Sequence, residues 1–202
     1  MPKQVDHGER RAAIALGVVG VIAEHGIGAV SVRSVARAAG VSTGQVQHYF
    51  ATKADLVLHA CRLFVDRATE QHAATAGAPP RERLEHLLVM GIPATPDQRV
   101  GAAVWQGFVT AAVTDARLAE VIASAWRARR DSVVELLTEI DPGSALPVPV
   151  LADLLAATAD GLTTRAIVGD VDQDDARATM HAHCVALGIG TAPGQVCGSR
   201  PI

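Results

Sequence analysis

The sequence predicts an all-helical fold, and three observations support this prediction. Aromatic residues make up only 3% of the 202 residues, although 49% of the chain is hydrophobic. Alanine is abundant, and alanine has the highest helix propensity, whereas strand-rich folds rely on aromatic and β-branched residues. Apolar residues also recur at helical spacing between stretches rich in glycine and proline. Together these features exclude a β-sandwich or a barrel.

Glycine and proline residues divide the chain into about nine predicted helices. The first ends at Gly26, and two short helices begin after Ser31 and Ser42. Thr52 begins a fourth helix that runs to about residue 76. The remaining helices are expected at about 81–91, 97–113, 115–140, 149–168 and 173–187. Residues 141–149 are predicted to form a loop because their prolines and glycine interrupt a helix, and residues 191–202 are predicted to form a loose tail.

Residues 31–50 have the pattern of a helix-turn-helix. Ser31 can cap a helix whose apolar residues share one face, and Gly40 lies where the chain must leave that helix with a positive φ. Ser42 and Gln45 then form an S-x-x-Q pattern, which is typical of a capping box at the start of the next helix. In a helix-turn-helix the second helix enters the major groove of DNA.

The predicted second helix is rich in polar side chains that suit DNA. Glutamine can form two hydrogen bonds with adenine, and threonine can place a methyl group against thymine. The lysine that follows Thr52 lies at a helix N-terminus, where an anion such as phosphate binds well. Candidate DNA-binding residues are therefore Ser31, Arg33, Ser42, Thr43, Gln45, Gln47, His48, Tyr49 and Lys53. Capped pairs of short helices also occur in proteins that bind no DNA, and Tyr49 and Phe50 could be ordinary core residues.

The segment from Ile22 to Leu56 resembles the DNA-binding domain of TetR-family transcriptional regulators. The matching stretches are A-E-H-G at 23–26, V-S-V-R-S-V-A at 30–36, A-G-V-S-T-G at 39–44, H-Y-F at 48–50 and T-K-A-D-L at 52–56. The resemblance implies a DNA-binding domain at 1–53 and a helical ligand-binding and dimerisation domain at 54–190. It assigns base reading to Gln45, Gln47 and His48, and phosphate contacts to Arg33, Thr43, Tyr49 and Lys53.

The first helix departs from this resemblance on its outer face. Ile14, Val18 and Ile22 provide the inward face, as in the family. Apolar or glycine residues stand where polar ones are expected, namely Leu16, Gly17, Gly20 and Val21. Each glycine costs a helix about 1 kcal/mol relative to alanine, so this helix is predicted to be weakened.

The rest of the chain is similar to the ligand domain of the betaine-inhibitor-like subgroup of the family. The similarity rests on V-W-Q-G-F-V-T-A-A-V-T-D-A-R-L-A-E at 104–120 and D-G-L at 160–162. Large side chains mixed with alanine and glycine can leave a cavity between helices, although such a pattern is also typical of a filled core. Candidate ligand-binding residues are Cys61, Phe64, Met90, Trp105, Phe108, Val109, Ala112 and Trp126. No cation is predicted inside this domain, which favours an apolar or weakly polar effector.

The last two helices are predicted to form a homodimer interface. Small residues lie beside a leucine stripe, so two helix pairs could form a four-helix bundle across a twofold axis. The candidate residues are Leu151, Leu154, Leu155, Thr158, Leu162, Met180, Cys184 and Leu187. The same stripe could instead pack only within its own chain. A dimer would present two recognition helices to a palindromic DNA site.

Charge and motifs limit the remaining function classes. Residues 1–53 hold six Lys and Arg against three Asp and Glu, a net charge of +3, and residues 54–202 carry −6. Three widely spaced cysteines favour a reducing cytoplasm, and no stretch is apolar enough to span a membrane. His181 and Cys184 share a helix face but lack further metal ligands, and no catalytic motif is present.

These observations predict a homodimeric repressor that a small-molecule effector releases from a palindromic operator, with no cofactor and no metal. A small-molecule-binding protein or an enzyme with a vestigial helix-turn-helix is the alternative.

Overall fold

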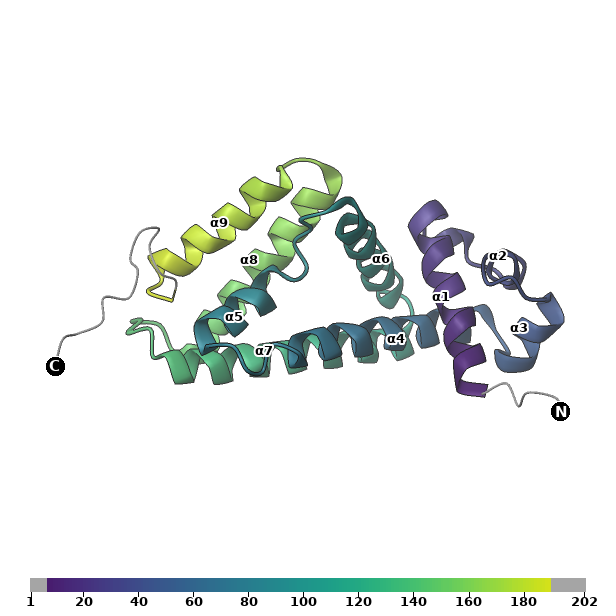
Figure 1. The fold of residues 1–202 in the computed structure, drawn as a ribbon, viewed down its shortest axis with the longest axis horizontal. Helices are drawn as coiled ribbons and strands as arrows, with labels where there is room; N and C mark the ends of the chain where they lie inside the picture. Colours follow the sequence, from purple (N-terminus) through teal and green to yellow (C-terminus); the bar gives the residue numbers. More distant parts are fainter. Residues whose placement is uncertain (1–6, 190–202) are drawn as a thin grey trace. The chain divides into compact units, whose positions relative to one another are not determined.

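The computed structural model describes residues 7–189, and these residues form nine α-helices and one short 3₁₀ helix (Figure 1). The all-helical prediction is therefore confirmed for this part of the chain, while the predicted tail at 191–202 lies outside it. The elements are α1 (His7–His25), η1 (Ile27–Ala29), α2 (Val32–Ala38), α3 (Thr43–Tyr49), α4 (Lys53–Ala73), α5 (Pro80–Val89), α6 (Pro96–Ala112), α7 (Ala116–Ile140), α8 (Val148–Val168) and α9 (Gln173–Ala186).

The described residues fall into two compact units. The first unit runs to Ala73 and includes Val100–Trp126, and the second contains Ala74–Arg99 and the chain from Arg127 onward. The first unit thus contains α1 to α4 together with parts of α6 and α7. It extends beyond the predicted DNA-binding domain because later helices pack on the first ones. The functional boundary after residue 53 stays a prediction.

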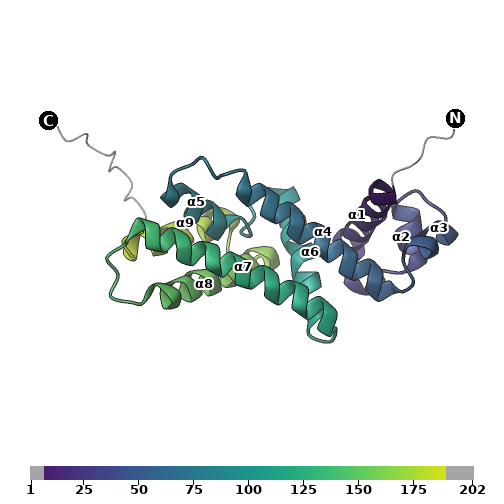
Figure 2. The same cartoon turned by 90° about the horizontal axis from the view of Figure 1, so that it is seen from below.

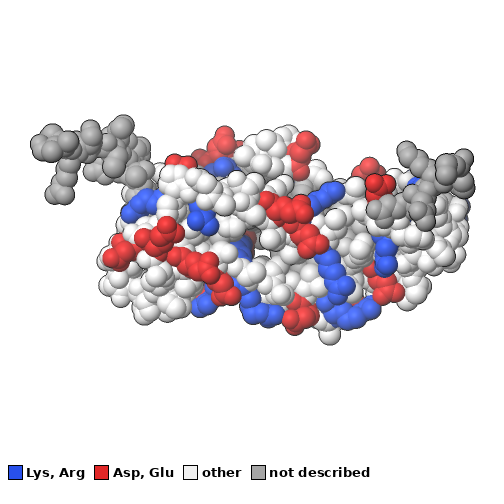
Figure 3. Space-filling view, turned by 60° about the horizontal axis from the view of Figure 1, so that its bottom comes forward, with Lys and Arg blue, Asp and Glu red and all other residues white. Residues whose placement is uncertain are grey.

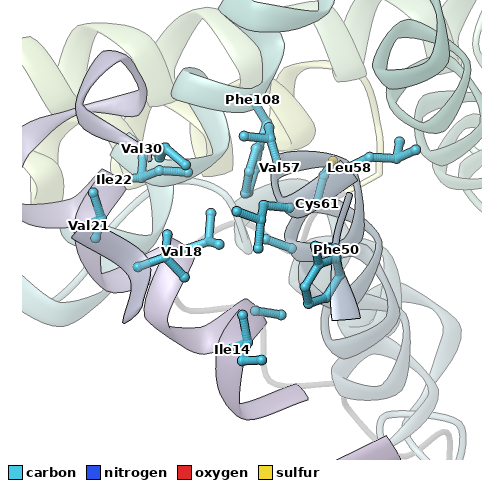
Figure 4. Packing of buried hydrophobic residues seen from close by; sticks show 14 of the residues in the cluster. Ile14, Val18, Val21, Ile22, Val30, Phe50, Val57, Leu58, Cys61 and Phe108 are labelled. Carbon is cyan, nitrogen blue, oxygen red and sulfur yellow. The ribbon is translucent and has the colours of Figure 1, made fainter. Parts of the chain in front are cut away.

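The core of the first unit lies between α1, α2, α4, α6 and the start of α7. Ile14, Val18 and Ile22 line the inner face of α1, as the sequence predicts. Figure 4 shows their side chains gathered with those of Phe50, Cys61 and Phe108 in one cluster. This cluster joins the helix-turn-helix to α4 and α6, so the recognition elements have no separate core of their own.

The buried face of α1 is wider than the sequence suggests. Gly17 and Val21, expected on the outer face, are both buried, so that expectation is wrong. The physical reason is that α1 packs against α2 as well as α4. A Cβ atom at Gly17 would lie only 2.9 Å from the Cβ of Ala39, so glycine permits the close approach of α1 to the end of α2. Leu16 is exposed, and Gly20 faces open space.

The second unit is built from α5, α8, α9 and most of α7. In Figure 2, α5 and α9 lie together, and α8 contacts both of them. Arg99 donates from Nη1 to the carbonyl of Ala166 at 3.2 Å, which satisfies the C-terminal end of α8. Arg129 and Arg130 of α7 form ion pairs with Asp160 and Asp153 of α8. The sequence interpretation of Pro149 as a loop residue is refined, because it lies in the first turn of α8, where proline is tolerated.

Candidate nucleic-acid interface and ligand-binding residues

The turn between α2 and α3 has the geometry that the sequence predicts. Ser31 caps α2 by accepting a hydrogen bond from the Ser34 N–H at 3.0 Å, and the Ser34 hydroxyl oxygen accepts from the Ser31 N–H at 2.9 Å. Gly40 ends the helix with φ +65°, as predicted, and the Val41 N–H donates to the Ala36 carbonyl at 2.9 Å. The backbone is thus fixed on both sides of the turn.

Helix α3 is anchored by one apolar residue and presents polar side chains to solvent. Val46 is fully buried, while Thr43, Gln47 and His48 are exposed and Gln45 is half-buried. Ser42 accepts from the Gln45 N–H at 3.1 Å, which is one half of the predicted capping box. The reciprocal box occurs instead at Ser31 and Ser34, where the hydroxyl oxygen of each serine accepts from the backbone N–H of the other.

Aromatic and histidine side chains meet at the C-terminal end of α3. The Tyr49 hydroxyl lies 3.3 Å from His7 Nδ1, and the rings of His7 and His48 both approach Tyr49 edge-on. Phe50 is buried, with the Arg11 guanidinium 5.1 Å from its ring centroid and the His59 ring beside it. Tyr49 is half-buried and its hydroxyl group contacts His7, whereas the Phe50 side chain belongs to the core.

The first turn of α4 is held by a reciprocal cap and an ion pair. Thr52 donates its N–H to Asp55 Oδ2 at 3.1 Å, and the Asp55 N–H donates to Thr52 Oγ1 at 3.1 Å. Arg117, in the first turn of α7, donates to Asp55 Oδ1 at 3.0 Å. The hydrogen bond from the Thr52 hydroxyl, followed by that from Arg117, lowers the pKa of Asp55. Lys53 donates from Nζ to the Gly28 carbonyl at 3.2 Å.

Sequence reasoning missed three residues of this region: His7, Asp55 and Arg117. The T-x-x-D pattern at 52–55 resembles a capping box and could have revealed Asp55. His7 and Arg117 stand 42 and 62 residues from their partners, so no local pattern could have placed them.

The remaining predicted DNA-binding residues lie on the surface. Ser31 and Arg33 are exposed at the start of α2, and Lys53 is exposed at the start of α4. Basic and acidic side chains lie next to one another on the face drawn in Figure 3.

Three aromatic rings from α4 and α6 pack on one another. Phe64 stacks on Trp105 with centroids 6.1 Å apart and an interplanar angle of 16°, and it meets Phe108 edge-on at 6.0 Å. Phe108 is fully buried, while Phe64 and Trp105 are half-buried. We call Phe64, Trp105 and Phe108 the aromatic cluster. Cys61 is buried in the same hydrophobic core, and this burial raises the pKa of its thiol to about 12, so the sulfur stays uncharged.

The other predicted ligand-binding residues lie in different surroundings. Val109 and Ala112 are half-buried against the same hydrophobic core as the aromatic cluster. Met90 packs in the second unit, and the Trp126 side chain is 42% exposed on α7. The first unit thus contains seven of the eight predicted residues, and six of them lie in or against its hydrophobic core, while Trp126 lies at its surface.

Most of the predicted interface residues lie inside the core of the second unit. Leu151, Leu155 and Met180 have no exposed surface, and Leu162 and Cys184 are also buried. Thr158 and Leu187 are half-buried, and Leu154 is 46% exposed. Apolar and small exposed residues recur at helical spacing along one side of α8, and we call them the α8 stripe: Val150, Leu154, Ala157, Gly161 and Val168.

Residues 7–189 contain neither a cluster of metal-ligating side chains nor a membrane-spanning helix. No group of three or more metal-ligating side chains lies together there, and His181 instead faces Glu85 at 3.5 Å. No helix in this range is long and apolar enough to cross a membrane.

Comparison with known proteins gives two family matches. Residues 80–188 match the family described as BetI-type transcriptional repressor, C-terminal, and residues 19–69 match that described as bacterial regulatory proteins, tetR family.

Individual relatives are regulators as well. The chain is 34% identical over 110 residues to the HTH-type transcriptional regulator PksA of Bacillus subtilis, a match that spans 54% of each chain. It is 28% identical over 167 residues to the HTH-type transcriptional regulator BetI of Rhizobium meliloti, covering 82% of this chain and 81% of that one. A solved transcriptional regulator from Saccharomonospora viridis in complex with choline shares the fold. Its TM-score is 0.81 at 22% identity, and the match covers 88% of this chain and 96% of that one.

Proposed function

The chain belongs to the TetR family of bacterial regulatory proteins, and from this premise we propose a homodimeric repressor that a small-molecule effector releases from a palindromic operator. The observation that carries the proposal is the geometry of α3. Its buried Val46 anchors the helix, while Thr43, Gln47 and His48 are free to face DNA. Such a regulator acts where the DNA is, in the cytoplasm.

The proposed contacts divide into base readers and phosphate binders. Gln45, Gln47 and His48 read base edges, because their amide and imidazole groups can both donate and accept hydrogen bonds. Arg33, Thr43, Tyr49 and Lys53 contact phosphates. Lys53 already donates one hydrogen bond to Gly28, and its ammonium group has two further donors for a phosphate oxygen.

A binding experiment tests this assignment. The full-length protein selects its preferred duplex from a random-sequence pool, and fluorescence anisotropy then measures Kd at several salt concentrations. Gln47→Ala should weaken binding to the selected duplex by about 1–3 kcal/mol and relax base preference, whereas Lys53→Ala should weaken binding to all duplexes and flatten the salt slope by about 1. Gln71→Ala, an exposed change on α4, is the matched control and should bind like the wild type.

The same experiment separates the alternative function. A wild-type chain that selects no sequence and shows no salt-sensitive binding would favour a small-molecule-binding protein or enzyme with a vestigial head.

The proposed dimer uses the α8 stripe, since the buried leucines of α8 are already occupied by their own chain. Small residues at Ala157 and Gly161 allow two copies of α8 to approach closely. Leu154→Glu should therefore shift sedimentation from dimer to monomer. Val113→Glu, at an 83% exposed apolar residue beyond the end of α6, should leave the dimer intact. A Leu154→Glu variant that stays dimeric contradicts this interface.

The proposed effector site is the aromatic cluster. Aromatic faces bind apolar groups and also quaternary ammonium ions through cation–π attraction, and the Saccharomonospora viridis relative was solved with choline. Because Phe64 covers Trp105, a ligand that separates these rings should change Trp105 fluorescence. Titrations of a Trp126→Phe variant with choline and with its neutral analogue 3,3-dimethylbutanol distinguish a charged from an apolar effector. If neither compound changes the Trp105 fluorescence, both kinds of effector are rejected for this site.

The proposed link to DNA binding runs through α6 and α7. A Cβ at Gly107 would lie 3.3 Å from Ile22 Cγ2, so α6 lies directly against α1. Arg117 at the start of α7 holds Asp55 at the start of α4. A displacement of α6 and α7 would therefore be transmitted to α1 and α4, the two helices that support the helix-turn-helix.

A further inference from the structure

The Tyr49 hydroxyl has a partner on another helix, at the start of α1. His7 is the first residue of α1, and Tyr49 is the last residue of α3. Their side chains meet with the Tyr49 oxygen 3.3 Å from His7 Nδ1 and with the two rings edge-on, their centroids 5.8 Å apart. The His48 ring approaches the same tyrosine at 5.2 Å. Two imidazoles thus flank one phenol at the end of the recognition helix.

The direction of this hydrogen bond decides what Tyr49 can do. A phenol has a single hydrogen to donate, and imidazole Nδ1 either donates or accepts according to its tautomer. If Nδ1 accepts, the phenol hydrogen is used within the protein, and only lone pairs remain to face a phosphate oxygen. If Nδ1–H donates, the phenol hydrogen stays available for an outside acceptor.

We infer that His7 is a positioning residue for DNA binding, which donates from Nδ1 to the Tyr49 oxygen and so directs the phenol hydrogen toward a DNA phosphate. This inference rests on the proposed function. It adds the start of α1 to the interface through Tyr49 rather than by direct contact with DNA. Because a phosphate contact is independent of sequence, its loss should weaken binding to every duplex, by about five- to tenfold.

A double-mutant cycle tests the inference on the full-length protein. Fluorescence anisotropy with a random-sequence duplex at low salt measures Kd for His7→Ala, Tyr49→Phe and the double variant. Each single change should weaken binding about five- to tenfold, and the double variant should be no weaker than Tyr49→Phe alone. His25→Ala, an exposed histidine at the other end of α1, is the control and should leave Kd unchanged.

Two further measurements separate positioning from a merely structural role. His7→Asn places an amide N–H where the imidazole Nδ1–H lies, so it should restore most of the affinity that His7→Ala loses. Nitrogen-15 NMR of the His7 ring in the wild-type chain should find the proton on Nδ1.

Additive effects in the cycle, no rescue by asparagine or an unprotonated Nδ1 would each overturn the role of His7. If the wild-type chain itself binds no duplex, the proposed function fails and the inference falls with it. Binding by the wild type with an additive cycle rejects the role of His7 alone.

Discussion

The close approach of α1 to α2 at Gly17 gives a quantitative prediction about stability. A Cβ atom at this position would lie 2.9 Å from Ala39 Cβ, 3.1 Å from Ala39 N and 3.3 Å from the Val35 carbonyl oxygen. Carbon atoms in contact prefer about 3.5–4.0 Å, so the Ala39 Cβ contact falls short by roughly 0.6–1.1 Å. Two of the three atoms belong to the backbone of α2 and its C-cap. The overlap can therefore be relieved only if α1 or α2 shifts as a whole.

Gly20 on the same helix provides the matched comparison, because a Cβ there meets nothing within 4 Å. Both substitutions gain the same helix propensity, about 1 kcal/mol for glycine to alanine. Only Gly17→Ala also suffers overpacking, which typically costs about 1–3 kcal/mol. Gly20→Ala should thus be more stable than the wild type, and Gly17→Ala should lie about 1–3 kcal/mol below Gly20→Ala.

Urea unfolding followed by circular dichroism at 222 nm measures both free energies of unfolding. For a chain of this size, each kcal/mol of difference in the free energy of unfolding between the two variants corresponds to a difference of roughly 2–4 °C in Tm. A Gly17→Ala variant as stable as Gly20→Ala would refute the reasoning, since it would mean that α1 and α2 separate without cost.

Three further predictions concern titration, reactivity and backbone strain. Burial, and secondarily Arg11, lowers the pKa of His59, so the unfolded chain binds this proton more readily and stability should fall as pH drops below about 6.5. His59→Leu should show a smaller loss of Tm between pH 7 and 5.5, and an equal loss contradicts this account. Burial raises the pKa of Cys61 to about 12 and that of Cys184 to about 11. Peptide mass spectrometry should find both thiols resistant to iodoacetamide at pH 8 in the folded chain and alkylated in guanidinium, and rapid native labelling would count against their burial. Asp141 has φ +46°, so Asp141→Gly should raise stability by roughly 1 kcal/mol in the urea assay, and a variant no more stable than the wild type contradicts strain at this residue.

The helices and their caps could be predicted because they depend on neighbours in the sequence. Ser31, Ser42 and Gly40 act where the pattern places them, since a cap involves groups only a few residues apart. Which of the two helices has the reciprocal capping box was harder to predict. Both Ser34 and Gln45 stand three residues after a capping serine, and the side-chain conformation decides which one returns a hydrogen bond.

Contacts between distant segments could not be predicted from a single sequence. The ion pair of Arg117 with Asp55 and the contact of His7 with Tyr49 depend on how the helices pack. The width of the buried face of α1 has the same origin, because Gly17 looks like an outer residue until α2 is placed against α1.

Apolar stripes on α8 show a second limit of sequence reasoning. Helical spacing identifies Leu151, Leu154 and Leu155 equally well as apolar residues, yet only Leu154 is exposed. Periodicity reports that a helix has an apolar side, and it does not report whether the same chain or a second copy covers that side. The proposed interface therefore follows from burial in the folded chain and not from the pattern.

The close helix contacts of the first unit bear on the proposed release mechanism. The aromatic cluster includes Phe108 of α6, and the neighbouring Gly107 brings α6 against Ile22 of α1. Five residues earlier on α1, Gly17 meets the end of α2 in the same close manner. At both contacts the glycine contributes no side chain, so only the side chain of Ile22 or the Cβ of Ala39 separates the two helices. We propose that a ligand that separates Phe64 from Trp105 moves α6 and α1 together, and α2 with them, because closely packed helices shift as rigid bodies.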